Sequence, residues 1–194
     1  MLVSASHSLS DFDSLAVGTN MQDVDGWEGW YGDPNWAAQV TDVVAYSGTN
    51  SLEIVGTRDD LVPNWPQQTT GKWTLSVMQY CPSDKQTTGV VYFGPLTEYD
   101  GAAETVGWIS EFLANFETGK AYCTGDDTIQ VDLVYDDWAE LRLEVDLDAQ
   151  EADFYYDNIF LSTQPAPSIA GVYIYPTDDI VAIYYDDFRF EAVE

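Results

Sequence analysis

Strict alternation of apolar and charged residues over Glu140–Asp148, ELRLEVDLD, is the feature that most constrains the fold of this chain. Every second position is apolar, and the positions between them carry acids and one arginine. Successive side chains of a strand point to opposite faces of a sheet. The pattern therefore predicts a strand with one face in a core and the other in water, which is typical of antiparallel sheets.

A second constraining stretch is Ile180–Glu191, IVAIYYDDFRFE, which is rich in β-branched and aromatic residues. This composition predicts a strand, which we take to be the last strand of a sandwich, beside the first strand. With uniform alternation, Asp186 falls on the same, more apolar face as Phe188 and Phe190. An ionised carboxylate on a core face must be paired, hydrogen-bonded or bound to a metal. We therefore expect Asp186 to be a ligand of a structural cation; the alternative is that it accepts hydrogen bonds from backbone amides or tyrosine hydroxyls.

The rest of the chain contains short apolar runs separated by turn residues, and no convincing amphipathic helix of ten residues. The segment 108–116, WISEFLANF, fits a helical face but is interpreted as a strand. The proline-containing segment 58–71 is interpreted as a loop. Ten or more short strands predict an all-β sandwich. A length of 194 residues suits one domain, which we place at residues 11–194 behind a tail at 1–10.

The charge balance is strongly acidic, with six Lys plus Arg against 34 Asp plus Glu and a net charge of −28. Phosphate contacts need Lys and Arg, so nucleic acid is excluded as a partner, and anionic glycans and membranes are disfavoured. No apolar run has transmembrane length, which argues against membrane insertion. The acidity indicates adaptation to salty water, where ions screen the repulsion, with cation binding by some of the acids in addition.

Residues 1–10 lack the basic start and apolar run of a signal peptide. His7, the only histidine, lies in this predicted tail, so histidine-based catalytic triads are excluded. Cys81 and Cys123 each follow a tyrosine and precede a turn-like segment. A disulfide and two free buried thiols both remain open for this pair.

Several segments taken together resemble concanavalin A-like jelly rolls. DFDSL, DGW, AYSGTNSLEI, WAELRLEVDLD followed by FYYDN, and YYDDFRF occur in the order seen in laminin-G-like and carbohydrate-binding-module-like domains of secreted bacterial and viral proteins. The resemblance spans residues 11–191 and implies a two-sheet antiparallel jelly-roll β-sandwich. This superfold hosts lectins, hydrolases, lyases and structural modules, so the resemblance alone does not settle an activity.

The resemblance also implies a calcium ion that joins the first strand to the last. The positions that match its ligands are Asp13, after the opening aromatic residue, and Asp186, in the closing pair. Carbonyl groups near Ser47 and Gly48 would complete the shell. Calcium suits such a set because it accepts several carboxylate and carbonyl oxygens in flexible geometry.

An enzymatic reading rests on Glu144, Asp146 and Asp148, which are similar to the E-x-D-x-x-E motif of glycosidases of this fold but lack the final glutamate. Alternation places all three acids on one strand face, where side chains could converge for retaining hydrolysis. The simpler interpretation is a solvated strand face in an acidic protein. We therefore expect no enzyme, with a glycoside hydrolase or lyase as the alternative.

Glycan binding is the function that the aromatic residues favour, because Trp and Tyr offer rigid apolar area with a polar group. Trp27, Trp73 and Trp138 are expected in the core. We expect a non-catalytic adhesion module, extracellular or on a virion surface, for a neutral polysaccharide or cell-surface glycan. A virion decoration or fibre protein is the alternative, and a homo-oligomer or attachment to a capsid or parent protein stays open. The candidate glycan-binding residues are Trp30, Tyr31, Trp36, Trp65, Tyr99 and Trp108.

Overall fold

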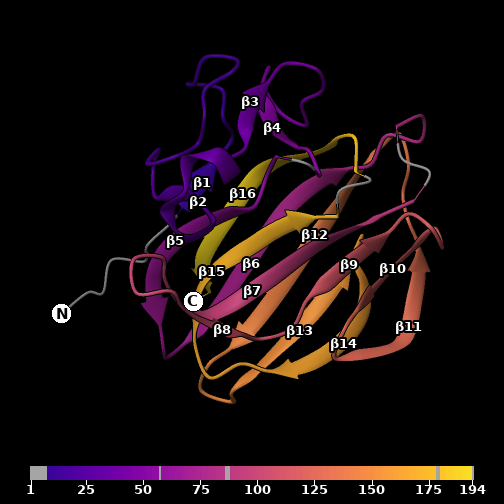
Figure 1. Ribbon diagram of the computed structural model, residues 1–194. Helices are drawn as coiled ribbons and strands as arrows, with labels where there is room; N and C mark the ends of the chain where they lie inside the picture. The colour runs from indigo at the N-terminus through magenta and orange to yellow at the C-terminus, as the bar shows by residue number, and fades with distance from the viewer. Residues whose placement is uncertain (1–7, 57, 86–87, 178–179, 194) are drawn as a thin grey trace.

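The computed structural model describes residues 8–56, 58–85, 88–177 and 180–193, which form two packed antiparallel sheets of eight strands each (Figure 1). In sheet A the order is β14 (Ile159–Pro165), β13 (Glu151–Tyr156), β12 (Trp138–Asp146), β6 (Lys72–Tyr80), β16 (Ile183–Val193), β4 (Ser51–Ile54) and β3 (Gln39–Thr41), with β1 (Ser8–Ser10) also paired to β16.

In sheet B the order is β11 (Asp126–Asp132), β10 (Lys120–Cys123), β9 (Phe112–Asn115), β7 (Val90–Asp100), β15 (Ile169–Pro176), β5 (Leu61–Gln68) and β2 (Trp27–Gly29), with β8 (Thr105–Trp108) paired to β7. Two short 3-10 helices, η1 (Trp30–Gly32) and η2 (Pro34–Trp36), follow β2. The described residues contain no α-helix, and none of their helical segments is long and apolar enough to cross a membrane. The predicted two-sheet jelly-roll sandwich is confirmed.

The core lies between the sheets and is built by alternation along the central strands. On β12 the inward residues Ala139, Leu141, Leu143 and Val145 are buried, as the sequence pattern predicts. Trp27 is also buried, and its ring meets that of Phe188 at 4.8 Å between centroids. Cys81 and Cys123 are both free and buried, so they form no disulfide.

Strand β5 lies inside the segment 58–71, which the sequence analysis assigned to a loop. That assignment was wrong because Leu61 and Val62 are fully buried, and their burial outweighs the two prolines. Proline removes a backbone donor, and the pairing of β5 with β15 is accordingly irregular between Ile169 and Gly171. At the N-terminus, Ser8–Ser10 of the predicted tail is strand β1; residues 1–7, with His7, lie outside the described residues.

Strand β16 does not alternate uniformly. A bulge between Asp186 and Arg189, with Asp187 at φ 50°, changes which residues face the core. Tyr185 faces the core before the bulge, and Phe188 does so after it. Asp186 is paired with Met78 of β6, on the outer face of sheet A, so its predicted core-facing register was wrong.

Trp138, expected in the core, is half-buried on the same outer face, where its ring lies 5.4 Å from that of Tyr80. It stands at the start of β12, one position before the inward residue Ala139. Alternation along the strand therefore turns Trp138 away from the sandwich interior.

Candidate functional site

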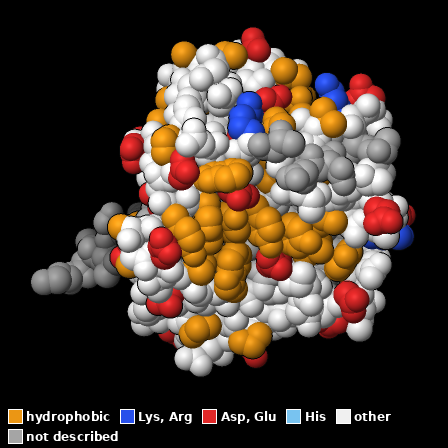
Figure 2. Space-filling view, viewed as in Figure 1, with side chains coloured by type: hydrophobic (Ala, Val, Ile, Leu, Met, Phe, Trp, Pro, Cys, Tyr) orange, Lys and Arg blue, Asp and Glu red, His pale blue; other side chains and the backbone are white. Residues whose placement is uncertain are grey.

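Seven aromatic side chains form one continuous cluster on the outer face of sheet B. Figure 2 shows a broad hydrophobic surface there, over the region of β7 and β15, with carboxylates at its margins. We call this surface the aromatic face; its members are Trp30, Tyr31, Tyr92, Tyr99, Trp108, Tyr173 and Tyr175.

The centre of the aromatic face comes from alternation along β15. Val172 and Ile174 are buried in the core, so Tyr173 and Tyr175 point outward and stack at 4.4 Å between ring centroids. The row continues on one side to Tyr92 of β7, at 4.5 Å and nearly parallel. On the other side Trp30 of η1 stacks on Tyr173 at 3.9 Å.

Rings stacked in a row cover one another's faces and leave mainly their edges exposed. The larger exposed areas belong to Trp108, which is 41% exposed, and to Tyr31, which is 36% exposed. Trp108 leans over Gly94 of β7, where a Cβ atom would lie only 2.8 Å from Cζ3 of the indole. The absence of a side chain at Gly94 therefore lets Trp108 lie down on the sheet.

Carboxylates accompany the tyrosines. Tyr175 donates a short hydrogen bond to Oε1 of Glu111, and Tyr173 is hydrogen-bonded to Asp60. Burial raises the pKa of Asp60 to about 6, although the Tyr173 hydroxyl opposes the shift. Tyr99 accepts a hydrogen bond from the Tyr31 amide at 3.0 Å, and burial beside Glu28 raises its phenol pKa well above the usual value. The apolar surface thus carries fixed hydrogen-bonding groups.

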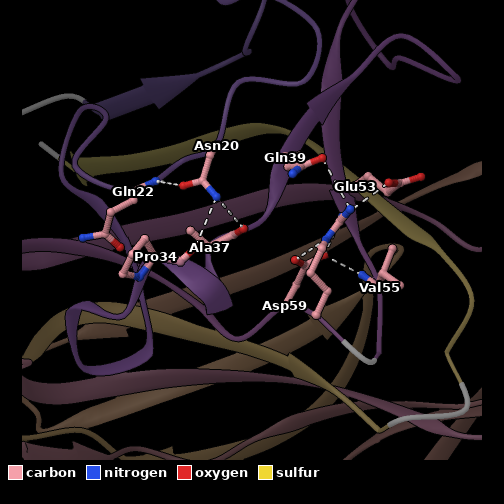
Figure 3. A network of polar contacts seen from close by, with 9 residues as sticks. Asn20, Gln22, Pro34, Ala37, Gln39, Glu53, Val55 and Asp59 are labelled. Carbon is pink, nitrogen blue, oxygen red and sulfur yellow. Dashed lines mark hydrogen bonds and ion pairs between the residues drawn. The ribbon is translucent and has the colours of Figure 1, made fainter.

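A polar network holds the loop that delivers Trp30 and Tyr31 (Figure 3). Nδ2 of Asn20 donates to the carbonyl oxygens of Pro34 and Ala37, at 3.2 and 3.3 Å. Nearby, Arg58 binds Asp59 at 2.7 Å, and Asp59 accepts from the amide of Val55 at 2.8 Å. These contacts fix the backbone of the loop and of the turn between β4 and β5.

Asp60 connects this network to the aromatic face. Its carbonyl oxygen accepts from the Trp30 amide at 2.8 Å, and its own amide donates to the carbonyl oxygen of Trp36, also at 2.8 Å. The aromatic loop is therefore tied to the start of β5 through backbone hydrogen bonds.

The structure brings together four of the six predicted glycan-binding residues, Trp30, Tyr31, Tyr99 and Trp108. Trp65 was wrongly expected at the surface; it is 9% exposed and stacks on Phe190 at 4.8 Å, because it lies on β5 rather than in a loop. Trp36 is 41% exposed but makes no ring contact with the cluster among the described residues.

Sequence reasoning missed Tyr92, Tyr173 and Tyr175. The signal was present, because tyrosine recurs at every second position of VYIY, residues 172–175. Such recurrence places both rings on one strand face. Tyr92 could not be joined to them without knowing that β7 and β15 are neighbours.

The predicted calcium residues meet at the segment 46–50, but through amide groups. Asp186 is fully buried, and its carboxylate accepts from the amides of Tyr46, Ser47 and Asp187 at 2.8, 3.1 and 2.7 Å. Oδ1 of Asp13 accepts from the amides of Thr49 and Asn50. Gly48, at φ 58°, leaves the space that the Asp13 carboxylate occupies.

This donor set does not fit a calcium ion as it stands, because N–H groups take the oxygens that a cation would need. The described residues contain no group of three or more His, Cys, Asp or Glu side chains placed to hold a metal. The geometry favours the alternative in which Asp186 accepts from backbone amides.

The enzyme-like acids lie on the outer face of sheet A. Glu144 and Asp146 line a groove of about 460 Å³ together with Glu151 and Asp153, which are opposite them on β13. The ammonium of Lys72 binds Asp146 at 2.7 Å and lowers the pKa of that carboxyl. A lowered pKa is the opposite of what a general acid needs. Asp148 accepts from the Gly71 amide at 3.1 Å.

Solved structures of known proteins share this fold. No protein-family model matches the chain, and no curated sequence matches it either. A sialidase structure is 11% identical with a TM-score of 0.64, covering 97% of this chain, although this chain spans only 19% of the sialidase.

Two further structures match over nearly their whole length. The catalytic domain of a glycoside hydrolase family 131 protein from Coprinopsis cinerea is 11% identical (TM-score 0.58, 95% of this chain and 93% of that one). Domain 4 of AbnA, a GH43 extracellular arabinanase from Geobacillus stearothermophilus solved with arabinotriose, is 13% identical (TM-score 0.53, 97% and 93%). The chain therefore has the concanavalin A-like jelly-roll fold that glycoside hydrolases and carbohydrate-binding domains share.

Proposed function

We propose that this protein is a non-catalytic glycan-binding module whose ligand lies on the aromatic face. The observation that carries the proposal is the continuous aromatic surface itself, with Trp108 and Tyr31 exposed on an otherwise acidic molecule. A large exposed apolar patch on a soluble domain marks an interaction site. Flat aromatic faces stack on the C–H faces of sugar rings, and rigid carboxylates and hydroxyls orient the sugar hydroxyls.

The polar groups point to a neutral glycan. Asp60 and Glu111 border the aromatic face, and the whole chain carries a net charge of −28. Both features repel an anionic polysaccharide. Carboxylates accept hydrogen bonds from sugar hydroxyls, and their pairing with Tyr173 and Tyr175 fixes them in place before a ligand arrives. Domain 4 of AbnA, solved with arabinotriose, shows that this fold accommodates a neutral oligosaccharide.

Glycoside hydrolysis is the second candidate, and the groove on sheet A is the feature that favours it. Its acids Glu144 and Asp146 are ion-paired to Arg142 and Lys72 at 3.0 and 2.7 Å. An acid and a base for hydrolysis need pKa values that their surroundings push apart. Because these two of the groove's four acids are held by cations, we propose binding rather than hydrolysis as the function.

The setting of the module also belongs to this proposal. We place it outside the cell or on a virion surface, attached to a parent protein or a capsid, where a negative charge of this size suits salty water. A structural calcium ion near Asp13 and Asp186 stays part of the proposal on the family resemblance alone, and binding it would require the amides of residues 46–50 to release these carboxylates.

A glycan array with and without EDTA tests the proposal, followed by an assay for reducing sugars on the glycans that bind. We expect binding to neutral glycans without release of reducing ends. Absence of any glycan binding would contradict the proposal, and release of reducing ends that is abolished by Glu144→Gln would establish the hydrolase instead.

A further inference from the structure

We propose a second, independent sugar site on the opposite sheet, a pocket of about 190 Å³ on the outer face of sheet A that takes one neutral pyranose unit. We call it the sheet A pocket. The pocket shares no residue with the aromatic face, so each site can be tested without the other. The residues that shape it are Tyr46, Ser76, Met78, Glu140, Asp187 and Arg189.

The bulge of β16 builds one wall of the pocket. Asp187 adopts φ 50°, a conformation that non-glycine residues rarely take and that is found preferentially at functional positions. Bulges re-aim side chains in this way. The Asp187 carboxylate lies at the pocket, where it accepts from Oγ of Ser47 at 2.7 Å and from Nη2 of Arg189 at 3.0 Å.

Asp186, the other half of the bulge, places the aromatic wall. Its buried carboxylate binds the amides of Tyr46 and Ser47 and so holds this loop against sheet A. The Tyr46 ring is 50% exposed and meets Trp138 edge-on, at 5.8 Å and 66°. The ring therefore keeps half of its surface exposed beside the pocket, where it can pack on a sugar ring.

The chemistry of the wall selects a neutral polyol. Asp187 and Glu140 supply carboxylate acceptors, Arg189 supplies guanidinium donors, and Ser76 also lines the pocket. Each carboxylate is balanced by an arginine, Asp187 by Arg189 and Glu140 by Arg142, so the wall favours neither an anion nor a cation. Adjacent hydroxyls of a pyranose both donate and accept, so they match this mixed set.

The consequence is a module with sites on both outer faces. The aromatic face lies on sheet B and the sheet A pocket on the other side of the core, so one molecule can bridge two glycan chains. On a surface that displays many copies of the glycan, two weak sites bind more tightly than either alone.

The experiment titrates isotope-labelled protein with glucose, galactose, mannose and xylose, and follows the amide resonances by NMR. We expect at least one of these sugars to shift the amides of Tyr46, Ser76 and Arg189. Tyr46→Ala should weaken this binding about tenfold, the effect of losing one stacking face. Arg189→Gln should weaken it as well, and Tyr46→Phe should preserve it.

Val43→Ala is the matched control, because Val43 is 65% exposed and precedes Tyr46 in the same loop. It should bind as the wild type, and so should Trp108→Ala, which removes only the aromatic face. The inference is overturned if none of the four sugars shifts these amides, or if Tyr46→Ala with an unchanged melting temperature binds as the wild type. It is equally overturned if glucuronate binds there more tightly than glucose.

Discussion

Asp186 is a fully buried carboxylate that is stabilised by backbone amides rather than by a cationic side chain in the described part of the chain. Three N–H groups from two segments, 46–47 and the strand itself, converge on its two oxygens. The residue therefore joins the loop before β4 to the bulge of β16. Its importance could be predicted from sequence, because an acid amid aromatic residues needs partners, but the nature of those partners could not.

Replacing Asp186 with asparagine should lower the free energy of unfolding by about 1–3 kcal/mol, because one amide oxygen cannot serve donors that now use two carboxylate oxygens. Chemical denaturation in EDTA measures this loss, since amide bonds need no cation. Thr49→Ala, in the same loop, is the control for general damage and should cost less. A variant as stable as the wild type in EDTA would argue against the amide role. A rise in the wild-type melting temperature with calcium at constant ionic strength, absent in Asp186→Asn, would support the proposed ion.

Asp60 should make stability depend on pH. Its pKa rises from 3.8 to about 6 on folding, mainly because burial disfavours the charged form. The native state then holds a proton that the unfolded chain has already lost. The stabilisation from this group is fully present below pH 3.8 and disappears as the pH rises through about 6.

Asp60→Asn removes this titration. The free energy of unfolding, measured with urea at about pH 4 and about pH 7, should fall less with rising pH in the variant than in the wild type. The other carboxyl groups contribute the same pH dependence to both proteins. Equal slopes for Asp60→Asn and the wild type would show that Asp60 has an ordinary pKa in the folded protein.

At the level of strands, regular alternation was predictable and interruptions were not. The predicted strand at Glu140–Asp148 corresponds to β12, because every position obeys period two. The bulge between Asp186 and Arg189 interrupts the alternation of β16, so the residues after it face the opposite way from what period two predicts. The only sign of the bulge in the sequence is the pair Asp186-Asp187. The two prolines of β5 led to the prediction of a loop, although this segment pairs with β15 as a strand. Because the segment was taken for a loop, Trp65 was expected at the surface, whereas it is buried.

Gly94 of β7 is the position where a strand controls the aromatic face. A Cβ atom there would lie 2.8 Å from the Trp108 ring, so Gly94→Ala should push the indole away from the sheet. Overpacking of this kind costs about 1–3 kcal/mol of stability. Tryptophan fluorescence should report a more solvated indole, and glycan binding should weaken. Unchanged fluorescence and affinity would mean that Trp108 does not lie on Gly94.

At the level of the whole molecule, repulsion among 34 acids opposes the compact state. Salt shortens the screening length from about 10 Å at 0.1 M to about 3 Å at 1 M. The melting temperature should therefore rise with sodium chloride, and choline chloride should act similarly if screening is the cause. A melting temperature that is independent of salt would contradict this view of the charge.

The sandwich itself could be predicted from periodicity and the family resemblance, whereas the site could be predicted only in part. Trp108 and Trp30, grouped from the sequence as candidates, do lie together, but no sequence pattern distinguished the exposed Trp108 from the buried Trp65. Tyr92 and Tyr175 are far apart in the sequence and meet only because β7 pairs with β15. Long-range pairing of this kind is set by the tertiary fold.

The central claim is that the aromatic face binds glycan, and the chain offers a matched pair of tryptophans to test it. Trp108 and Trp36 are both 41% exposed, but only Trp108 belongs to the aromatic face. The measurement is calorimetric affinity of the wild type, Trp108→Ala and Trp36→Ala for the best neutral glycan found on the array. We predict that Trp108→Ala loses about 1–3 kcal/mol of binding free energy, the scale of one stacked ring, while Trp36→Ala binds as the wild type. Equal affinities for Trp108→Ala and the wild type, or a loss in Trp36→Ala alone, would contradict the account.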